Sequence, residues 1–447
     1  METHRPDPIL EPETELDTAA VSRVLSQLAE RPGDAADVYF EHTEDVELPN
    51  GGEAPGLRVW REGGLAVRLV RGGETWLASR DRIDNESFGD AVRRVARTMP
   101  STPFLQPQVG RFVWTAQPEA PEVLGFPSLV RRALRAQDVG VRVRLRVRRH
   151  RRWVRVIGLH VASGLERECF YSAVAEGPFG QCGALFIGLD GAAAEVLARR
   201  VARAIAAEDA PAAPEGETRC VLGSAATAVL LHEAVAHALE ADVLARGGHP
   251  EAAIGVQLGS PLLNVFDDPT SAPLPVRRRA DDEGYPTLRR CLLRAGKVEQ
   301  PISDSLWAGR SDLLVPGGGR RGHRHAGPTP RSLHLELAAG DRSTQELLQD
   351  ADGGFFFPEA ERGWLDPDSG HFTLRFPYGL RIRDGAPSEL FGPCSVNAHV
   401  SELLAKVNGV GRESREAGAG WCAKGGVRLA VWANAPAMSL DTMELGP

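Results

Sequence analysis

Residues 231 to 242 read LHEAVAHALEAD, a helix-favouring stretch that carries two histidines, with a glutamate directly after the first. Neutral imidazoles are good zinc ligands, and a carboxylate beside a metal can take a proton from the water that the metal binds. In an ideal α-helix, His232 and His237 would point roughly 140° apart, because each residue turns the helix by about 100°. We therefore expect a kink or a π-bulge near Ala234 to Ala236 if both rings bind one ion.

A third ligand has to come from another part of the chain, and Cys422 is the best candidate. It lies in the glycine-rich segment GAGWCAKGG at 418–426. Thiolate is a strong zinc ligand, and the nearby Lys424 would help to keep the sulfur deprotonated. Two histidines and one cysteine leave a fourth position open, as catalysis requires. The structural alternative is a pair of hydrogen-bonded core histidines and a buried cysteine that packs as a small apolar residue.

Several segments in order resemble the signatures of the TldD/PmbA metallopeptidase family. HEAVAHALEAD is similar to the family's HEAxGHxLEGD, and WCAKGG is similar to its GxCGKxGQ segment. Between them stand DDEG at 281–284, GRR at 319–321, and a block at 330–340 that begins Pro-Arg and ends LAAG. The resemblance covers most of residues 220–440, whereas the amino-terminal half matches only in general pattern.

The resemblance implies a zinc peptidase of the TldD type, the kind of subunit that keeps HExxxH. His232, His237 and Cys422 would hold Zn²⁺, and Glu233 would be the general base that activates water. The implied substrate is an unfolded or extended peptide in an internal cavity, such as the leader of a modified peptide or a small unfolded protein. The implied assembly is a homodimer, or a heterodimer with a PmbA/TldE-type subunit.

The chain departs from the family pattern at four positions near the expected site. Alanine replaces glycine at 236, 241 and 423, and Val427 stands where glutamine is usual. None of these changes removes a ligand, but the added Cβ atoms are expected to narrow the space around the metal.

Four further residues are candidates for supporting roles. Glu240, three residues after His237, is a candidate acceptor for an imidazole N–H. His323, His325 and Arg321 lie together in RRGHRH and are candidates for contacts to the substrate or the transition state, because a hydrolase needs a donor opposite the metal. The alternative for this cluster is a flexible basic loop.

An arginine-rich run from Arg142 to Arg155 alternates with apolar residues at its start, which predicts a strand with one cationic face followed by a turn at 149–152. The net charge of the whole chain is −8, and few aromatic residues interleave the run. We interpret this strand as a solvated face or a subunit contact in preference to a nucleic-acid surface. An acidic peptide is a further candidate partner for it.

The chain of 447 residues exceeds the roughly 250–300 at which a single core stops growing, so two or more domains are expected. Its six cysteines form no close pairs, which favours a reducing compartment. The start of the chain has no apolar targeting segment, and no run of about 18 apolar residues follows. We therefore predict a cytoplasmic protein without a membrane anchor.

The predicted fold class is α+β. Strand-like runs at 38–48, 57–61, 65–70 and 74–78 are separated by predicted Gly-Gly turns, including one at Gly63 and Gly64. Together with helical spacing at 18–30 and 86–99, they indicate an antiparallel α+β domain over 1–105. A middle α+β region with the basic hairpin would span 106–214, and the Pro- and Ala-rich stretch at 206–218 predicts a linker. A β-rich metal-binding domain that opens with the distorted HExxxH helix would span 215–447.

Two other readings of the function stay open. The chain could be a catalytically inactive partner or scaffold subunit of a TldD/PmbA-type assembly. It could also be a nucleic-acid- or gyrase-associated regulator that acts by binding. We rank the peptidase first, because neither alternative requires Glu233 beside His232.

Overall fold

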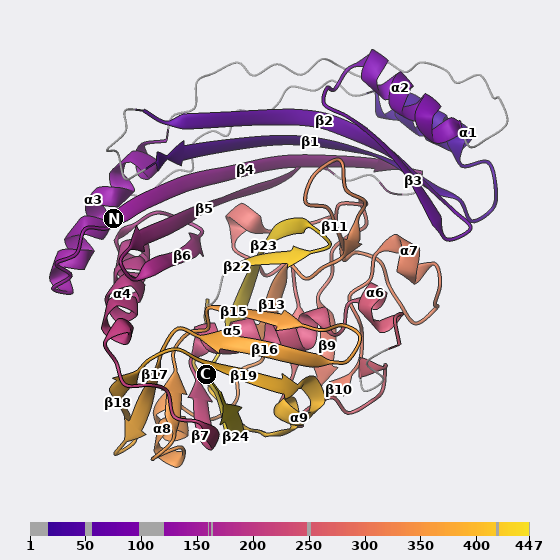
Figure 1. The fold of residues 1–447 in the computed structure, drawn as a ribbon. Helices are drawn as coiled ribbons and strands as arrows, with labels where there is room; N and C mark the ends of the chain where they lie inside the picture. Colours follow the sequence, from indigo (N-terminus) through magenta and orange to yellow (C-terminus); the bar gives the residue numbers. More distant parts are fainter. Residues whose placement is uncertain are drawn as a thin grey trace.

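A six-stranded antiparallel sheet arches over the rest of the molecule (Figure 1). The computed structural model describes residues 17–49, 56–97, 120–159, 161, 164–247, 252–416 and 420–446. Residues 1–16 lie outside these ranges, and the expectation of no targeting segment depends on them. Residues 418–419 of the cysteine segment lie outside them as well. The strand order is β3-β2-β1-β4-β5-β6. The strands are β1 (Ala35–Leu48), β2 (Arg58–Arg71), β3 (Glu74–Arg80), β4 (Arg144–Gly158), β5 (Glu166–Gly177) and β6 (Gly180–Phe186).

Strand β2 runs without a break where the sequence predicted two strands separated by Gly63 and Gly64, so this prediction is wrong. Both glycines lie inside the strand because neighbouring groups leave no room for a side chain. A Cβ atom at Gly63 would come within 2.5 Å of the His42 ring, and one at Gly64 would overlap the Arg80 carbonyl. Here the glycines serve close packing and not a turn.

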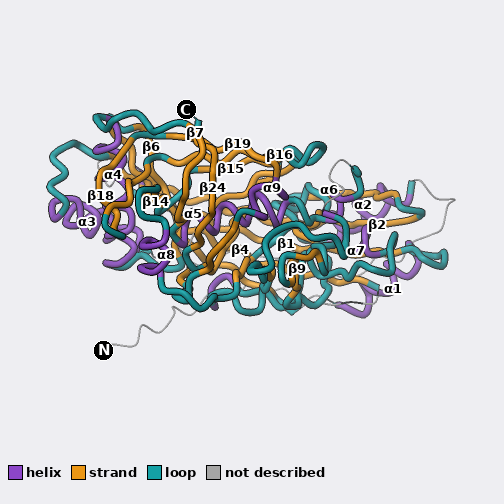
Figure 2. Tube along the Cα trace, turned by 90° about the horizontal axis from the view of Figure 1, so that it is seen from below, coloured by secondary structure: helices purple, strands orange, loops and turns teal. Residues whose placement is uncertain are grey.

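Four helices cover the two ends of this sheet. Helices α1 (Thr18–Leu28) and α2 (Asn85–Ala96) pack at one end, and α3 (Pro121–Ala136) and α4 (Gly191–Glu208) at the other. Asp17 caps α1 by accepting a hydrogen bond from the backbone N–H of Ala20. Figure 2 shows the molecule as elongated, with one helix pair at each end. No helix within the described ranges is long and apolar enough to cross a membrane.

From Arg144 onward, the arginine-rich run forms one uninterrupted strand, β4, so the predicted turn at 149–152 is wrong. Strand β4 pairs with β1 on one side and with β5 on the other along this stretch. Arg149 is fully buried, and its guanidinium contacts Glu44 of β1 and Glu122 of α3 at 3.3 and 2.9 Å. Carboxylates from other elements also contact Arg148, Arg151 and Arg152. These contacts weaken the interpretation of the strand as a nucleic-acid surface.

The segments 1–105 and 106–214 contribute three strands each to the same sheet. The expected linker at 206–218 is shorter than predicted, because α4 extends to Glu208 and the next strand begins at Gly216. Only 209–215 joins the two elements. The domain boundaries themselves stay a prediction.

The second half of the chain is rich in strands, as predicted. One sheet has the order β18-β17-β14-β7-β24-β20, a second the order β10-β9-β8-β13-β23-β21 with β22 on β23, a third the order β15-β16-β19, and β11 pairs with β12. The strands are β7 (Gly216–Leu222), β8 (Val265–Asp267), β9 (Arg290–Arg294), β10 (Lys297–Val298), β11 (Gly319–Arg320), β12 (Thr329–Pro330), β13 (His334–Leu337), β14 (Phe355–Phe357), β15 (Arg362–Leu365), β16 (His371–Phe376), β17 (Gly379–Arg383), β18 (Ala386–Phe391), β19 (Cys394–His399), β20 (Val407–Val410), β21 (Arg415–Glu416), β22 (Gly420–Lys424), β23 (Val427–Ala435) and β24 (Met438–Leu445).

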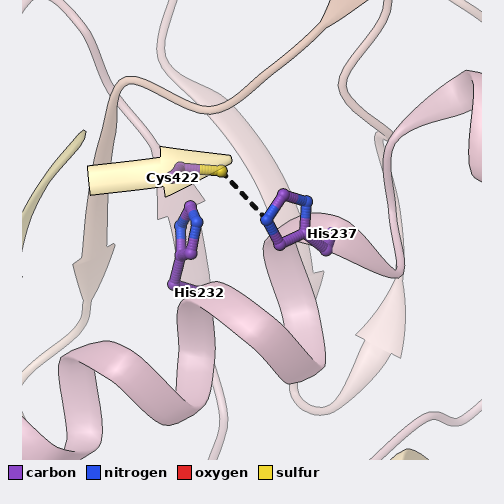
Figure 3. A group of neighbouring side chains, drawn as sticks. All are labelled: His232, His237 and Cys422. Carbon is purple, nitrogen blue, oxygen red and sulfur yellow. Dashed lines mark hydrogen bonds between the residues drawn. The ribbon is translucent and has the colours of Figure 1, made fainter. Parts of the chain in front are cut away.

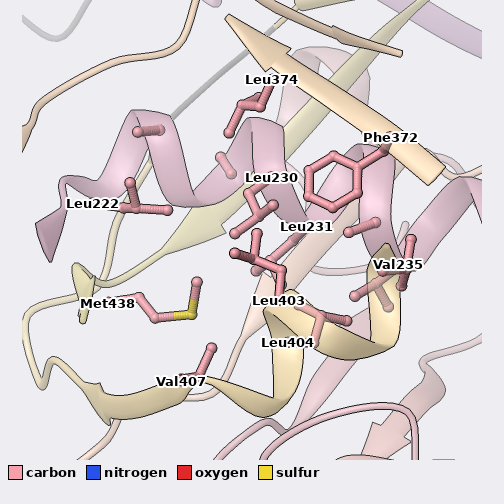
Figure 4. Packing of buried hydrophobic residues seen from close by; sticks show 14 of the residues in the cluster. Leu222, Leu230, Leu231, Val235, Phe372, Leu374, Leu403, Leu404, Val407 and Met438 are labelled. Atoms are coloured by element: carbon pink, nitrogen blue, oxygen red, sulfur yellow. The ribbon is translucent and has the colours of Figure 1, made fainter. Parts of the chain in front are cut away.

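The site helix runs through the middle of this half. It consists of α5 (Ser224–Leu231) and the turn η2 (His232–His237); the other helices are α6 (Ala241–Leu244), η4 (Leu274–Val276), α7 (Ser305–Ala308), α8 (Thr344–Asp350) and α9 (Val400–Ala405). Leu230, Leu231 and Val235 pack in the same buried cluster as Phe372 and Leu403 (Figure 4). A helix that is apolar on most of its faces is held in a core, which fixes the position of the histidines that follow α5.

Buried ion pairs join the arched sheet to the second half. Arg68 of β2 contacts Asp37 of β1 at 2.5 Å and Glu283 at 2.6 Å, and Arg321 contacts Asp37 at 2.8 Å. All four side chains are nearly or fully buried. Glu283 and Arg321 belong to the DDEG and GRR segments, so these two motifs hold the two halves together. Removal of one partner from such a network leaves an uncompensated buried charge, which is strongly destabilising.

Candidate metal centre

The predicted distortion of the HExxxH helix is confirmed. The helix is regular to Leu231 and then continues as a π-helix from His232 to His237. In a turn closed by i→i+5 hydrogen bonds, residues five apart come onto the same face of the helix. The two imidazole rings accordingly lie side by side, with their centroids 4.6 Å apart. The unusual spacing of the histidines and the unusual turn therefore match each other.

The third candidate ligand meets the two histidines from a distant strand. Cys422 lies on β22, and its Sγ is 3.1 Å from the Nε2 of His237 (Figure 3). One ligand atom from each of His232, His237 and Cys422 lies within 4.8 Å of the others. Zinc bonds of about 2.0–2.3 Å in a tetrahedron place ligand atoms roughly 3.5 Å apart, so the three groups fit around one ion with little movement.

The hydrogen bonding of the imidazoles supports the same interpretation. The Nε2 of His232 is buried and has no hydrogen-bond partner in the described structure, which is costly for a polar atom unless a ligand engages it. The other nitrogens are held from behind: the Nδ1 of His237 lies 3.0 Å from Glu240, and that of His232 lies 3.4 Å from the Ser332 hydroxyl. Such outer contacts orient metal-binding imidazoles. Two nitrogens and one thiolate sulfur suit zinc.

Charge interactions keep the cysteine in its ligand form. Burial raises the pKa of the Cys422 thiol, but His232 and His237 outweigh this effect and bring the pKa to about 4. Burial lowers the pKa of His237, but Glu240 and Cys422 together raise the pKa well above its usual value. Burial also raises the pKa of Glu240, yet His237 and Lys424 lower it to about 2. Without metal, the site therefore pairs a thiolate with an imidazolium.

The lysine or arginine that contacts the Cys422 sulfur is Arg331 and not Lys424, so this part of the sequence-based prediction is wrong. A guanidinium nitrogen of Arg331 donates to the Sγ of Cys422 at 2.8 Å and to its carbonyl oxygen at 3.0 Å. Lys424 donates instead to Glu240 and Asp242, at 2.6 and 2.7 Å. Lys424 thus supports the carboxylate that orients His237. Arg331 lies in the block at 330–340, but its approach to the sulfur was not predictable from that motif.

Glu233 lies at the partly open side of the helix, next to strand β15. After the first residue of α5, Ser224, the helix residues with partial exposure are Ala225, Val229, His232, Glu233 and His237, which form one stripe along it. Gly363 of β15 packs directly on Glu233, because a Cβ atom at Gly363 would overlap the Glu233 side chain. The glycine thus leaves room for the Glu233 side chain and limits where it can move. No sequence signal marked Gly363.

The cluster at 321–325 lies against the arched sheet. Arg321 is fully buried and paired with Asp37, so it is a structural residue and not one that is open to a substrate. The Nδ1 of His325 lies 2.8 Å from the Ser79 hydroxyl. His323 lies beside His325, with the ring centroids 5.6 Å apart. Among the described residues, the candidate metal group comprises only His232, His237 and Cys422, so neither of these histidines belongs to it.

The alanines that replace family glycines leave the ligand groups in place. Ala236 and Ala241 are buried in the core, with 0% and 3% exposure. Ala423 alternates with Cys422 along β22 and is exposed, so its Cβ faces away from the sulfur. Val427 packs on Gly322, where a Cβ atom would overlap the valine side chain.

The fold and the site define an α+β protein with a candidate His₂Cys metal centre on a π-distorted helix. Residues 215–446 match the model of the PmbA/TldA metallopeptidase C-terminal domain. The chain therefore belongs to the PmbA/TldD metallopeptidase family, as its ordered motifs predicted.

Two known metalloproteases are similar in sequence to about half of the chain. The chain is 29% identical over 248 residues to a metalloprotease TldD homolog of Haemophilus influenzae, and 29% identical over 254 residues to a metalloprotease of Methanothermobacter thermautotrophicus. These matches cover 55% and 56% of this chain, and 52% and 55% of the relatives. The chain thus spans about half the length of the curated relatives it matches.

Two solved structures share the fold over nearly the whole chain. TldE of Thermococcus kodakarensis superposes with a TM-score of 0.71 at 17% identity, over 96% of this chain and 100% of that one. A Thermotoga maritima protein, whose name describes it as a candidate modulator of a DNA gyrase, superposes with a TM-score of 0.72 at 18% identity. That match covers 96% of this chain and 99% of the other. At such identities the likeness concerns the fold.

The raised pKa of His237 predicts a pH-dependent uptake of zinc. Below its pKa the imidazole is protonated and must lose a proton before Nε2 can bind, whereas the Cys422 thiol is already ionised near neutral pH. Zinc affinity should therefore fall about tenfold for each unit by which the pH drops below the pKa of His237. Chelator competition across pH measures this slope.

The variant Glu240→Gln provides the control, because it removes the carboxylate that raises the pKa of His237. In this variant, the fall in zinc affinity should therefore begin at a lower pH. An affinity that does not change with pH in the unaltered protein would contradict the role of His237 as a ligand.

Proposed function

We propose that the chain is a zinc-dependent peptidase of the TldD type. The observation that carries the proposal is the convergence of His232, His237 and Cys422, with the buried Nε2 of His232 left without a hydrogen-bond partner. Membership of a metallopeptidase family and the metalloprotease names of the relatives support the same reaction class.

The proposed roles divide between the ligands and the residues around them. A zinc ion held by the three ligands would supply Lewis acidity toward a peptide carbonyl and toward water. Glu233 would accept a proton from the attacking water and pass it to the leaving amine. Glu240 would orient His237, with Lys424 and Arg331 holding Glu240 and the sulfur in place.

The proposed substrate is a peptide in extended form. Strand β15 is an edge strand of the sheet β15-β16-β19, and it packs on η2. An extended peptide can add to such an edge through backbone hydrogen bonds, which need no particular side chains. Because Gly363 of β15 contacts Glu233, a peptide paired there would pass close to the proposed base. A folded segment offers no free backbone for this pairing, which favours unfolded substrates.

We further propose a cytoplasmic protein that works as a homodimer or beside a PmbA/TldE-type subunit. The shared fold with TldE of Thermococcus kodakarensis is compatible with a common mode of assembly. The alternative is an inactive scaffold subunit. Such a subunit would bind zinc but cleave no peptide, either by itself or together with a PmbA/TldE-type subunit.

Replacement of Glu233 by Gln tests the proposed chemistry. The amide keeps the size of the side chain but cannot accept the proton, so turnover should fall by about 10²–10⁴ while the zinc content stays the same. The measurement is cleavage of unstructured peptides, with metal analysis of the same samples, alone and with a PmbA/TldE-type subunit. The control is Glu299→Gln at an exposed ion pair. Full activity of Glu233→Gln would refute the role of Glu233.

Replacement of Gly363 by Ala tests the contact that confines Glu233. The new Cβ would overlap the Glu233 side chain and displace its carboxylate, so kcat should fall about tenfold or more with zinc retained. The control is Gly188→Ala, where a Cβ meets no atom within 4 Å. If both variants cleave peptides at the rate of the unaltered protein, Gly363 has no part in placing the base.

A further inference from the structure

A cavity of about 670 Å³ lies between the arched sheet and the metal-bearing half. Arg146 and Arg148 of β4 line it from the sheet, Val229 lines it from α5, and Trp421 and Arg428 line it from the hairpin of β22 and β23. Ala360 and Glu361, the residues that lead into β15, close another side. The cavity therefore joins three elements that also build the candidate metal centre.

Two features connect the cavity to the proposed base. Ala225 and Val229, which line the cavity, belong to the partly exposed stripe of the helix that continues to His232 and Glu233. Residues four apart lie on the same helix face, so Glu233 follows Val229 by one turn, about 5 Å along the axis. The chain at 360–363 also runs from the cavity wall to Gly363, which touches Glu233. A peptide near Glu233 can thus extend into the cavity.

Four arginines line the cavity, and three of them contact a carboxylate. Arg148 contacts Glu47 at 2.5 Å, Arg200 contacts Glu359 at 2.6 Å, and Arg146 contacts Glu176 at 3.3 Å. Besides Glu47, the lining contains the carboxylate of Glu361, which is paired with Arg375 at 3.1 Å.

Arg428 is the lining arginine that lacks such a partner within the described part of the chain. Its guanidinium lies over the Trp421 ring, 4.5 Å from the ring centre. Arg428 is exposed as a residue, and the partial burial of its guanidinium lowers its pKa. Trp421 is held in turn by the edge of His150 and by Phe170, at centroid distances of 5.3 and 5.6 Å. The stacked guanidinium keeps its donors in a plane, ready for a planar anion.

We propose that Arg428, stacked on Trp421, forms a subsite that binds a carboxylate of the peptide substrate. The carboxylate can come from an Asp or Glu side chain near the cleaved bond or from the carboxyl terminus of the peptide. This assignment rests on the proposed peptidase function. Pairing of the peptide backbone with the edge of β15 would select no particular sequence. The Arg428 subsite would add a preference for peptides that carry a carboxylate.

The test compares unstructured peptides that differ in one carboxylate. One series, with amidated carboxyl ends, places Glu or Gln at successive positions on both sides of the cleaved bond, and a second compares free with amidated carboxyl ends. The unaltered holoenzyme should prefer one carboxylate-bearing peptide by about tenfold in kcat/KM. In Arg428→Gln the ratio should fall to about one. The series that shows the preference identifies the source of the carboxylate.

Arg310→Gln is the matched control, because Arg310 also stacks on a tryptophan, Trp307, with 4.4 Å to the ring centre, but lies outside the cavity lining. Arg310→Gln should keep the preference for the carboxylate-bearing peptide. In the unaltered protein this preference should weaken as salt is added, because ions screen the contact between Arg428 and the carboxylate. A preference that survives in Arg428→Gln, or a ratio near one at every position and at the carboxyl end, would overturn the assignment.

Peptide binding separates the failure of the subsite from the failure of the proposed function. If no peptide is cleaved, the peptidase proposal fails, but fluorescence anisotropy with the same labelled peptides still tests Arg428. Tighter binding of the carboxylate-bearing peptide that is lost in Arg428→Gln supports the subsite. Equal binding of both peptides by the unaltered protein overturns it.

Discussion

The widened helical turn from His232 to His237 is the constraint on which the candidate centre depends. In a regular helix these two imidazoles would diverge, and a single ion could not hold both. The π-turn brings the rings together, and the apolar core around α5 and Val235 keeps this turn in place. Because π-turns are less favourable than α-turns in isolation, the surrounding packing has to stabilise it. The position of Cys422 on β22 then completes the group from the other side of the core.

A second constraint acts at long range. The described residues of the arched sheet contribute none of the candidate ligands, but the inner face of the sheet forms one wall of the cavity beside the candidate metal group. Buried ion pairs of Arg68, Asp37, Glu283 and Arg321 fix this wall relative to the second half. Charges that are buried in pairs demand defined partners and directions, so they suit a contact that has to set one orientation. The DDEG and GRR segments are thus part of the scaffold, although they lie between the two segments that carry the candidate ligands.

Local patterns predicted the centre well and its surroundings less well. The five-residue spacing of the histidines was enough to predict a π-distortion, because the geometry of a helix leaves few ways to bring both rings to one ion. Arg331 was not predicted as the partner of Cys422, since its contact depends on a strand arrangement that brings together residues 91 positions apart. The turn expected at 149–152 failed for a similar reason: the carboxylates that hold these arginines in a strand come from β1 and α3. Gly63 and Gly64 looked like a turn because the close neighbours that require them are distant in sequence.

The most direct test of the central claim is zinc-edge X-ray absorption on the purified protein. We predict stoichiometric zinc with one sulfur neighbour at about 2.3 Å and the other neighbours at about 2.0 Å, the distances of a His₂Cys site with one open position. The sulfur signal should disappear in Cys422→Ser. A protein that binds no zinc, or one that binds zinc without a sulfur neighbour, would contradict the convergence of His232, His237 and Cys422 on a single ion.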